Sequence, residues 1–365
     1  MSRLFSDLNG NRKLRLESYN ICKIGGSLLR SGKDYANLAP IINDCIPVIS
    51  AMRGVTDKLV LAAQRQDINA LNEIHDLYID ALNEVSPPNR ALYMGLLRDV
   101  ASSAMRHLLM NNQDAVIAHG ELFSIIIMAA ALETIGANAR PVYDPGILIE
   151  ESRSGSRISG LSGFYVRQRL TSLINRGIIP VIPGFIGWFR NGTPGTLGRG
   201  GSDYTASLLA YYLGASQITF YTDVPGIYSG DPRIVNNPRL VDSMSIEEAY
   251  VFSIMGGKKF HPKTFEPLID TDIVAVITMP GSGMGTIISR KTRRGPKAVA
   301  VFDAARIGGR GYAVAIIGHM DPREVPIRLD FRDRGGNAFG LVLGDEENAA
   351  AAARSLHEWV ISWAR

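Results

Sequence analysis

The stretch with the most chemical potential is residues 196–207, Thr-Leu-Gly-Arg-Gly-Gly-Ser-Asp-Tyr-Thr-Ala-Ser. It lies between an apolar run at 177–187 and an apolar helical pattern at 206–214, which predicts a strand, a glycine-rich turn and a helix start. Glycines let the backbone approach a bound group, and a helix N-terminus attracts anions. Arg199 offers a guanidinium for a carboxylate or phosphate, and Asp203 implies a lysine or metal partner. A capped helix with a solvated arginine explains this stretch equally well.

A second candidate is Lys23, at the end of a short apolar strand expected at 18–24 and followed by Gly25, Gly26 and Ser27. A lysine and backbone N–H groups at a strand end can surround phosphate oxygens. Phosphoryl transfer requires such an arrangement because positioning and charge stabilise most of its transition state. The alternative is an exposed lysine beside a turn. The chain has no Walker-type phosphate loop, and no G-x-G-x-x-G follows the first strand.

Other polar residues stand where expected elements begin or end. The strand expected at 46–50 runs into Ser50 and Thr56, whose hydroxyls can bind a polar substrate or cap a helix. Glu121 opens the helix expected at 122–135. A glutamate there usually complements the helix dipole, but in a pocket it could hold an ammonium group.

Two later loops suit a nucleotide. The strand expected at 217–221 leads into a polar loop with an aromatic ring for a base and an arginine for phosphate. A helix expected at 245–255 is followed by glycines and lysines that could also meet phosphate oxygens. The residues concerned are Thr222, Asp223, Tyr228, Arg233 and Lys258.

The elements that must position these residues alternate between strand and helix from residue 18 to residue 290. This alternation predicts an α/β sandwich around a mainly parallel sheet, with ligands at the carboxyl ends of the strands. Beyond a basic linker come four strand-like runs and an amphipathic helix, which predict a small α+β unit. The runs are 298–302, 312–318, 325–331 and 338–343, and the helix is 345–363. The predicted organisation is a flexible extension (1–17), a catalytic domain (18–290), a linker (291–297) and a C-terminal domain (298–365).

Composition narrows the class of protein. Of the 365 residues, 46% are hydrophobic and 20% charged, which is enough apolar material for a packed core in two or three domains. The formal net charge of +4 is mild, and the basic cluster at 290–297 has no interleaved aromatic residues. A solvated linker is therefore expected there, and no nucleic-acid partner.

The two cysteines, Cys22 and Cys45, lie in apolar strand-like runs and are expected to be buried free thiols. No cluster of Cys and His suggests a metal site. The polar N-terminus, residues 1–18, has no apolar signal region, and no apolar run reaches membrane-spanning length. These features predict a cytoplasmic protein without a membrane partner.

Taken together and in order, the motifs resemble those of aspartate kinase, in the amino acid kinase family. The resemblance covers residues 20–290. It is carried by the segments SAMRGVTD, AHGELFS, GFIG, TLGRGGSDYTAS, YTDVPGIYSGDPR and GGKKFHP. It implies transfer of the ATP γ-phosphoryl group to the β-carboxylate of L-aspartate, the first step towards lysine, threonine and methionine. It also implies the amino acid kinase fold and an ACT-like C-terminal domain.

The resemblance implies a role for each matching residue. Lys23 would be the catalytic lysine, oriented by Asp203, while Glu121 would hold the substrate ammonium group and Arg199 its α-carboxylate. The remaining aspartate-site residues would be Ser50, Thr56, Phe185, Gly200 and Ser202. The ATP-site residues would be Lys23, Gly25, Gly26, Ser27, Thr222, Asp223, Tyr228, Arg233 and Lys258. ATP would bring Mg²⁺, held largely by phosphates and water. No general base is expected because the acceptor carboxylate is already ionised near neutral pH.

Two features depart from the family pattern. The first motif, Lys23-Ile24-Gly25-Gly26-Ser27-Leu28, resembles other branches of the family, which phosphorylate acetylglutamate, nucleotides or isoprenoid phosphates. Aspartate kinases usually carry two ACT-type modules, whereas residues 298–365 leave room for one reduced module. The alternatives are therefore a family kinase with another acceptor, or a degenerate amino acid sensor. We predict a homodimer formed partly through the C-terminal domain, with weak or no inhibition by lysine or threonine.

Overall fold

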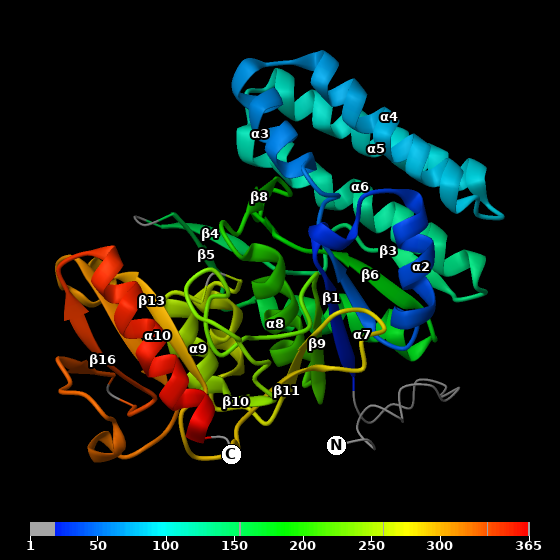
Figure 1. Ribbon diagram of the computed structural model, residues 1–365. Helices are drawn as coiled ribbons and strands as arrows, with labels where there is room; N and C mark the ends of the chain where they lie inside the picture. Colours follow the sequence, from blue (N-terminus) through cyan, green and yellow to red (C-terminus); the bar gives the residue numbers. More distant parts are fainter. Residues whose placement is uncertain (1–18, 153–154, 258, 334, 364–365) are drawn as a thin grey trace. The chain divides into compact units, whose positions relative to one another are not determined.

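The computed structural model describes residues 19–152, 155–257, 259–333 and 335–363 (Figure 1). The chain divides into two compact units between Asp223 and Val224, and each is described by itself. The flexible extension predicted at 1–17 lies outside the described residues. Residues 290–297 contain no helix or strand. The domain boundary predicted there stays a prediction.

The first unit is built on a parallel sheet with the strand order β9–β1–β2–β6–β3. The strands are β1 (Asn20–Ile24), β2 (Ile46–Ile49), β3 (Ala139–Pro141), β6 (Ile179–Pro183) and β9 (Gln217–Tyr221). Both faces of this sheet are covered, which is why β2 and β6 read as continuous apolar runs and are buried throughout.

Residues along β1 alternate between two layers of helices. Cys22 and Ile24 belong to the hydrophobic core that also contains the buried side of α6 (Gln113–Thr134). Lys23 points the other way and pairs with Asp203 on α8 (Gly201–Leu213). Because successive strand residues face opposite sides of a sheet, helices flank both faces. The predicted α/β sandwich around a mainly parallel sheet is confirmed.

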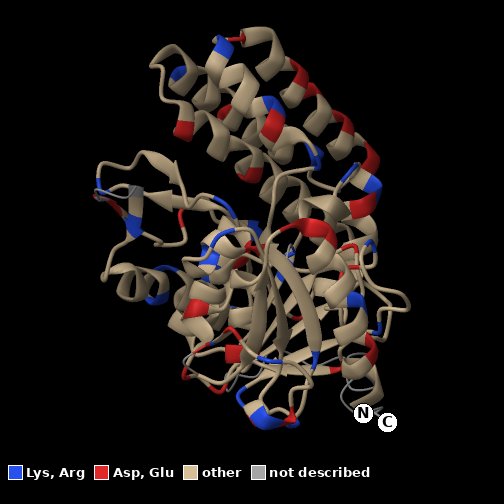
Figure 2. Cartoon of the chain, turned by 60° about the vertical axis from the view of Figure 1, so that its left-hand side comes forward, with Lys and Arg blue, Asp and Glu red and all other residues tan. Residues whose placement is uncertain are grey.

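Helices α4 and α5 of the first unit carry an apolar face inwards and charged residues outwards. Figure 1 shows α4 and α5 side by side, and Figure 2 shows basic and acidic residues interspersed along the helices. A break at Ser86 and two prolines separates α4 from α5, as the sequence predicts. Besides α6 and α8, the helices are α2 (Gly32–Ile42), α3 (Val55–Arg65), α4 (Ile68–Val85), α5 (Arg90–Leu109) and α7 (Ser162–Asn175).

Helix α6 is longer than predicted. It starts after Asn112, whose side chain accepts a hydrogen bond from the Ala115 N–H, and not at residue 122. By length and composition it could cross a membrane, so the expectation that no apolar run reaches that length is wrong for it. In the described structure, however, 94% of that apolar stretch is buried, as in the core helix of a packed domain. The cellular location stays a prediction.

Two small antiparallel hairpins were not predicted as such. One joins β4 (Ile149–Ser152) to β5 (Gly155–Ile158), and the other joins β7 (Ile186–Trp188) to β8 (Pro194–Thr196). The second hairpin lies within the stretch predicted as one strand followed directly by a glycine-rich turn. Phe185, with φ of +68°, ends the extended run and sends the chain into the hairpin.

The second unit contains two groups of paired strands. In the first, β12 pairs with β10 in parallel and with β11 in antiparallel fashion. Helix α9 begins at a capping box formed by Ser245 and Glu248. The second sheet is antiparallel, in the order β13–β14–β16–β15, and α10 packs on β13, β14 and β16 (Figure 1). The elements are β10 (Ser243–Ser245), α9 (Ile246–Ile254), β11 (Val274–Thr278), β12 (Gly285–Ser289), β13 (Ala298–Asp303), β14 (Tyr312–Ile317), β15 (Phe331–Arg332), β16 (Ala338–Leu343) and α10 (Glu346–Trp363).

The C-terminal part agrees with the predicted α+β, ACT-like region in most respects. The strand predicted at 325–331 is reduced to the two residues of β15, because the chain before it forms a short 3-10 turn at Pro322–Glu324 and an irregular segment. That turn stands where a longer module would have a helix. Strand β14 pairs on both sides, so it offers no free edge.

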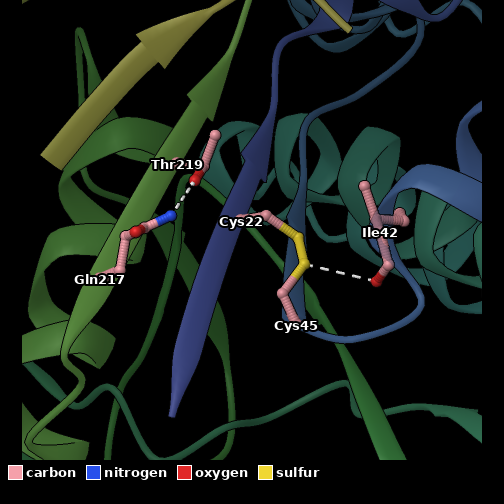
Figure 3. Close-up of a disulfide and its surroundings, with 5 residues drawn as sticks. All are labelled: Cys22, Ile42, Cys45, Gln217 and Thr219. Atoms are coloured by element: carbon pink, nitrogen blue, oxygen red, sulfur yellow. Dashed lines mark hydrogen bonds between the residues drawn. A yellow bond between two sulfur atoms is a disulfide. The ribbon is translucent and has the colours of Figure 1, made fainter. Parts of the chain in front are cut away.

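The two cysteines are joined in a disulfide, so the prediction of free thiols is wrong (Figure 3). Strands β1 and β2 are parallel neighbours, with Ile21 opposite Ile46. Cys22 lies opposite Pro47, and Cys45 directly precedes β2, so the Cα atoms of the two cysteines are 5.9 Å apart, within the range that a disulfide requires. The prediction rested on the apolar strand-like runs around the cysteines, which do not reveal how the strands pair.

Candidate active site

A cavity of about 400 Å³ opens at the carboxyl ends of β1, β2 and β6, in the first unit. This is the edge where parallel α/β sheets bind ligands, because turns and helix N-termini converge there. Its lining includes most of the residues predicted for phosphoryl transfer and aspartate binding. They are Lys23, Gly26, Ser27, Ser50, Thr56, Glu121, Phe185, Arg199, Gly200, Ser202 and Asp203.

The centre of the cavity is an ion pair between Lys23 Nζ and Asp203 Oδ1, 2.7 Å apart. Both side chains are 13% exposed, so each is largely shielded but still reaches the cavity. Lys23 is held by β1, and Asp203 lies in the first turn of α8, where the helix dipole favours a negative charge. The predicted turn-then-helix arrangement is present, and Gly200, with φ of +75°, starts the helix in place of a side-chain cap.

Glu121 is the most deeply buried charged group of the cavity, at 3% exposure. It lies in the middle of α6, so its prediction as a helix-start residue is wrong. One carboxylate oxygen accepts the Ala51 N–H at 3.2 Å, while the other has no hydrogen-bond partner among the described residues. Burial raises the pKa of Glu121 to about 8, against the opposing effects of backbone hydrogen bonds and the Lys23 charge. A cationic group next to the free oxygen would relieve this penalty.

The rim of the cavity is shaped by the glycine-rich loop. Gly198 and Gly200 both adopt left-handed conformations, with φ of +75°, and present the exposed Arg199 between them. A Cβ atom on Gly184 would lie 2.7 Å from that of Ser202, so only glycine lets the end of β6 approach α8 this closely. Phe185 keeps its left-handed conformation while its N–H donates to Thr205 Oγ1 at 3.1 Å.

A second pocket, of about 320 Å³, lies within the second unit. It is lined mainly by apolar side chains and includes Tyr228 and Arg233, two of the residues predicted for ATP. Arg233 makes a two-point ion pair with Asp231, at 3.1 and 2.9 Å, and its side chain is 71% exposed. Lys258 lies outside the described residues, although its neighbours Gly257 and Lys259 line the pocket.

Comparison with known proteins gives the relationship. The sequence profile of the amino acid kinase family matches residues 18–279. The chain is 31% identical over 339 residues to lysine-sensitive aspartokinase 3 of Escherichia coli, an alignment that covers 85% of this chain and 75% of that protein. This chain belongs to the amino acid kinase family. The predicted resemblance to its aspartate kinase branch is confirmed.

Further relatives of this amino acid kinase differ in length. Aspartokinase 1 of Arabidopsis thaliana chloroplasts is 28% identical over 303 residues, and the alignment covers 76% of this chain but 53% of that protein. Crystal structures of E. coli aspartokinase III, with lysine and aspartate or with aspartate and ADP, have TM-scores of 0.77 and 0.78 at 20% identity. They cover 94% of this chain and 99% and 100% of those chains, which establishes a common fold.

Among the described residues, three predicted for ATP line neither pocket: Gly25, Thr222 and Asp223. The Gly25 N–H donates to the Tyr221 carbonyl at 3.1 Å, across the β1–β9 pair. That N–H is therefore not directed at a phosphate, and Gly26 and Ser27, which open a short 3-10 turn, face the cavity instead. Thr222 Oγ1 donates to the Asp223 carboxylate at 3.2 Å.

The cavity also contains charged residues that were given no role from the sequence. Arg53 and Asp57 line it from the turn that starts α3, and both are exposed. They belong to the SAMRGVTD segment, so the signal was present, but helix-cap chemistry explained the segment equally well. Among the described residues no group of three His, Cys, Asp or Glu side chains could hold a metal ion.

Proposed function

We propose that this kinase transfers the γ-phosphoryl group of ATP to the β-carboxylate of L-aspartate, giving 4-phospho-L-aspartate and ADP. The observation that carries the proposal is the charge pattern of the first cavity. This pattern complements the ammonium group and the two carboxylates of an acidic amino acid. It consists of the buried carboxylate of Glu121, which has a free oxygen, of Arg199 at the rim and of Lys23 at the centre. The relatives named aspartokinase support the same acceptor.

Acceptor binding is assigned to the two ends of this pattern. Glu121 receives the substrate ammonium group, and it loses its proton when that cation arrives because the cation offsets the burial penalty. Arg199 forms a two-point contact with the α-carboxylate. Ser50, Thr56, Phe185, Gly200 and Ser202 complete the aspartate site.

The transfer step needs charge stabilisation rather than a base. The β-carboxylate is ionised near neutral pH, and one of its oxygens attacks the γ-phosphorus while the bond to the β-phosphate oxygen breaks and ADP leaves. No proton has to be removed from the acceptor. Lys23 neutralises charge on the transferring group, and the 2.7 Å ion pair with Asp203 orients the ammonium group of Lys23. Mg²⁺ would be part of the MgATP substrate, held largely by phosphate oxygens and water.

ATP binding is assigned to the residues that match the family's ATP-site pattern. Lys23, Gly26 and Ser27 meet the transferring end, and Gly25 shapes the turn. Tyr228 and Arg233 line the pocket of the second unit and are assigned to the base and the phosphates. Thr222, Asp223 and Lys258 are assigned to the nucleotide on the family pattern alone. The order of these residues along the chain is that of the aspartate kinase motifs.

The test is a coupled assay of ADP release with a panel of acceptors. L-aspartate should support turnover, whereas acetylglutamate, nucleoside monophosphates and isoprenoid phosphates should not. Turnover with one of these others and not with aspartate would favour the family kinase with a different acceptor. Binding of aspartate without ADP release from any acceptor would favour a degenerate sensor. The intact Lys23–Asp203 pair argues against that last possibility.

We also propose a homodimer formed partly through residues 298–365, with weak or no inhibition by lysine or threonine. The edge strand β15 supports a chain-to-chain contact, because unpaired strand edges tend to pair. The rings of Trp359 and Trp363 on α10 meet edge to face with their centroids 5.4 Å apart, and Trp359 packs on the core beneath that helix. Sedimentation of the full chain decides the oligomeric state, and a monomer would refute the dimer. Clean inhibition by sub-millimolar lysine or threonine would refute the expectation about regulation.

A further inference from the structure

The pocket of the second unit is built from segments that are far apart in the sequence. One wall is the loop at 224–235, which holds Tyr228 and Arg233. Another wall comes from β13, through Val299 and Val301, and from α10, through Ala353. The C-terminal region, expected from sequence to be a separate regulatory module, thus supplies part of the lining of a pocket that carries predicted ATP residues.

We propose that β13 and α10 form a wall of the nucleotide pocket, so that the C-terminal region is a structural part of the ATP site. The proposal rests on the assignment of Tyr228 and Arg233 to ATP made above. The adenine base is the group that contacts this wall. His357 of α10 is then a positioning residue for the loop that carries Tyr228 and Arg233.

The chemistry of the lining fits an aromatic base. Three phenylalanines, Phe252, Phe260 and Phe265, and several aliphatic side chains surround the pocket. Small-molecule sites are mostly apolar, with few polar groups that fix orientation, and aromatic rings provide flat contact surfaces. Ala353 is 1% exposed, and its side chain is a single methyl group, so α10 takes up little space in the pocket at this position. A larger side chain at this position would occupy space that the base needs.

Hydrogen bonds tie the loop to the wall at Ser229, which directly follows Tyr228. The Val299 N–H of β13 donates to the Ser229 carbonyl at 2.8 Å. Ser229 Oγ shares a hydrogen bond of 2.8 Å with His357 Nε2 and accepts the Arg239 N–H at 2.9 Å. The side chains of Ser229 and His357 are buried, so each would lose a partner inside the protein if this bond were removed.

Burial also disfavours the protonated form of the His357 imidazole. Its pKa lies below the usual histidine value because of burial, and the nearby Arg239 charge lowers it further, against the opposing effect of Glu358. Arg239 itself donates to the Ile361 carbonyl of α10 at 3.2 Å. The loop, the turn after it and α10 are therefore connected by three separate side-chain or main-chain contacts.

The main test fills the pocket from the α10 side. Ala353→Leu should raise the KM for ATP at least tenfold and leave the KM for aspartate within about twofold, since the added atoms enter only the nucleotide pocket. Ala351→Leu is the matched control, because Ala351 is exposed on the same helix. Equal ATP KM values for the two variants would overturn the proposal. If Ala353→Leu does not fold, the smaller Ala353→Val gives the same comparison.

A second test separates positioning from general stability. His357→Gln keeps an amide that can bond Ser229 Oγ, whereas His357→Ala keeps none. His357→Ala should raise the ATP KM, and His357→Gln should restore most of the loss, at a temperature where both are folded. A fall in thermal stability with both KM values unchanged would overturn the positioning role.

A third set of variants distinguishes failure of this inference from failure of the ATP-site assignment. Tyr228→Ala and Arg233→Ala should each weaken ATP binding, measured by calorimetry on the full-length protein. If they do not, the assignment of this pocket to ATP fails. If they do, and the Ala353 and His357 variants bind ATP normally, only the inference about the C-terminal wall fails.

Discussion

The two cavities of this kinase have similar volumes and opposite chemistry. The one at the strand ends of the first unit, about 400 Å³, contains Lys23, Asp203, Glu121 and Arg199. The one in the second unit, about 320 Å³, is lined mostly by aliphatic and aromatic side chains. Fixed charges in a partly dry site act strongly on a charged substrate, whereas apolar lining stabilises a flat base through buried area. Under the proposed assignments, the first cavity would stabilise the transition state and the second would contribute mainly to the affinity for ATP.

The two cavities also differ in whether their charged side chains are paired within the protein. Glu121 has a free buried oxygen and a pKa raised to about 8, so the first cavity is electrostatically incomplete without a cation. In the second, Arg233 is already paired with Asp231. We therefore expect changes in the first cavity to act on turnover and on the acceptor, and changes in the second to act on ATP alone.

The largest effect is expected from Lys23. Lys23→Ala should lower kcat on the order of 10³-fold, because it removes the charge partner of the transferring phosphoryl group and leaves Asp203 unpaired. Lys58→Ala is the control, since Lys58 is exposed on α3. Steady-state kinetics at saturating substrates measure the change. A Lys23→Ala enzyme that keeps near-normal turnover would contradict the central role of this ion pair.

Next in size is the acceptor site. Glu121→Gln and Arg199→Ala should each raise the aspartate KM about 10- to 100-fold, because a charge on the bound substrate would lose its partner. The ATP KM should change little, and Glu73→Gln, on the exposed side of α4, should change neither. Equal effects on the KM values of both substrates would show that Glu121 and Arg199 do not act specifically on aspartate binding.

These residues show most clearly which features of the site could be predicted from the sequence. The strand end at Lys23 and the helix start near Asp203 were predicted from local signals, which depend only on neighbouring residues, whereas the pairing of the two was implied by the family resemblance. The helix boundary at Glu121 was wrong because α6 is apolar on all sides, so periodicity gave no sign of where it begins. Its depth in the core, and hence its raised pKa, follows from packing that only the fold reveals.

Long-range pairing explains the remaining differences. The cysteine pair depends on the register between β1 and β2, which are separated in sequence by a whole helix. The wall that β13 and α10 give to the second pocket depends on contacts with residues more than 60 positions away. Neither can be read from composition or local pattern, whereas the parallel sheet itself could be predicted from the alternation of strands and helices.

A smaller, graded effect is expected from pH. The free protein holds a proton on Glu121 up to about pH 8, and the aspartate ammonium group requires the carboxylate. Binding should therefore release a proton, and the aspartate KM should fall as the pH rises from about 6 to 8 and then level off. Glu121→Gln should remove this dependence. A flat profile for the native protein would mean that Glu121 is already ionised.

The same shift has a consequence for stability. Because the folded-state pKa of Glu121 is above its unfolded value of 4.5, the folded chain binds the extra proton between these pH values. Without aspartate, the contribution of this group to the free energy of unfolding is greatest below pH 4.5 and is lost as the pH rises through 8. Denaturant titrations at several pH values should show that the free energy of unfolding falls less steeply with rising pH in Glu121→Gln than in the native protein.

The smallest effect on activity is expected from the disulfide, although it adjoins the catalytic strand. Cys22 precedes Lys23 but faces the core on the α6 side, whereas Lys23 points towards α8. Figure 3 shows the Cys22–Cys45 bridge between β1 and the start of β2, with Cys45 Sγ 3.3 Å from the Ile42 carbonyl oxygen. The bridge closes a loop with a sequence separation of 23 residues, so reduction should lower the free energy of unfolding by about 3 kcal/mol. Turnover at a temperature where the chain stays folded should be unchanged.

Cys45→Ala is the matched variant for this last prediction. It should lose the same stability as the reduced native protein, and added reductant should then have no further effect on its denaturant midpoint. Thiol titration of the unreduced native protein in denaturant should detect no free thiol. Two titratable thiols would instead support the free, buried cysteines that composition suggested. A large loss of turnover on reduction would mean that the two sides of β1 are not independent, and that the polar cavity depends on the core behind it.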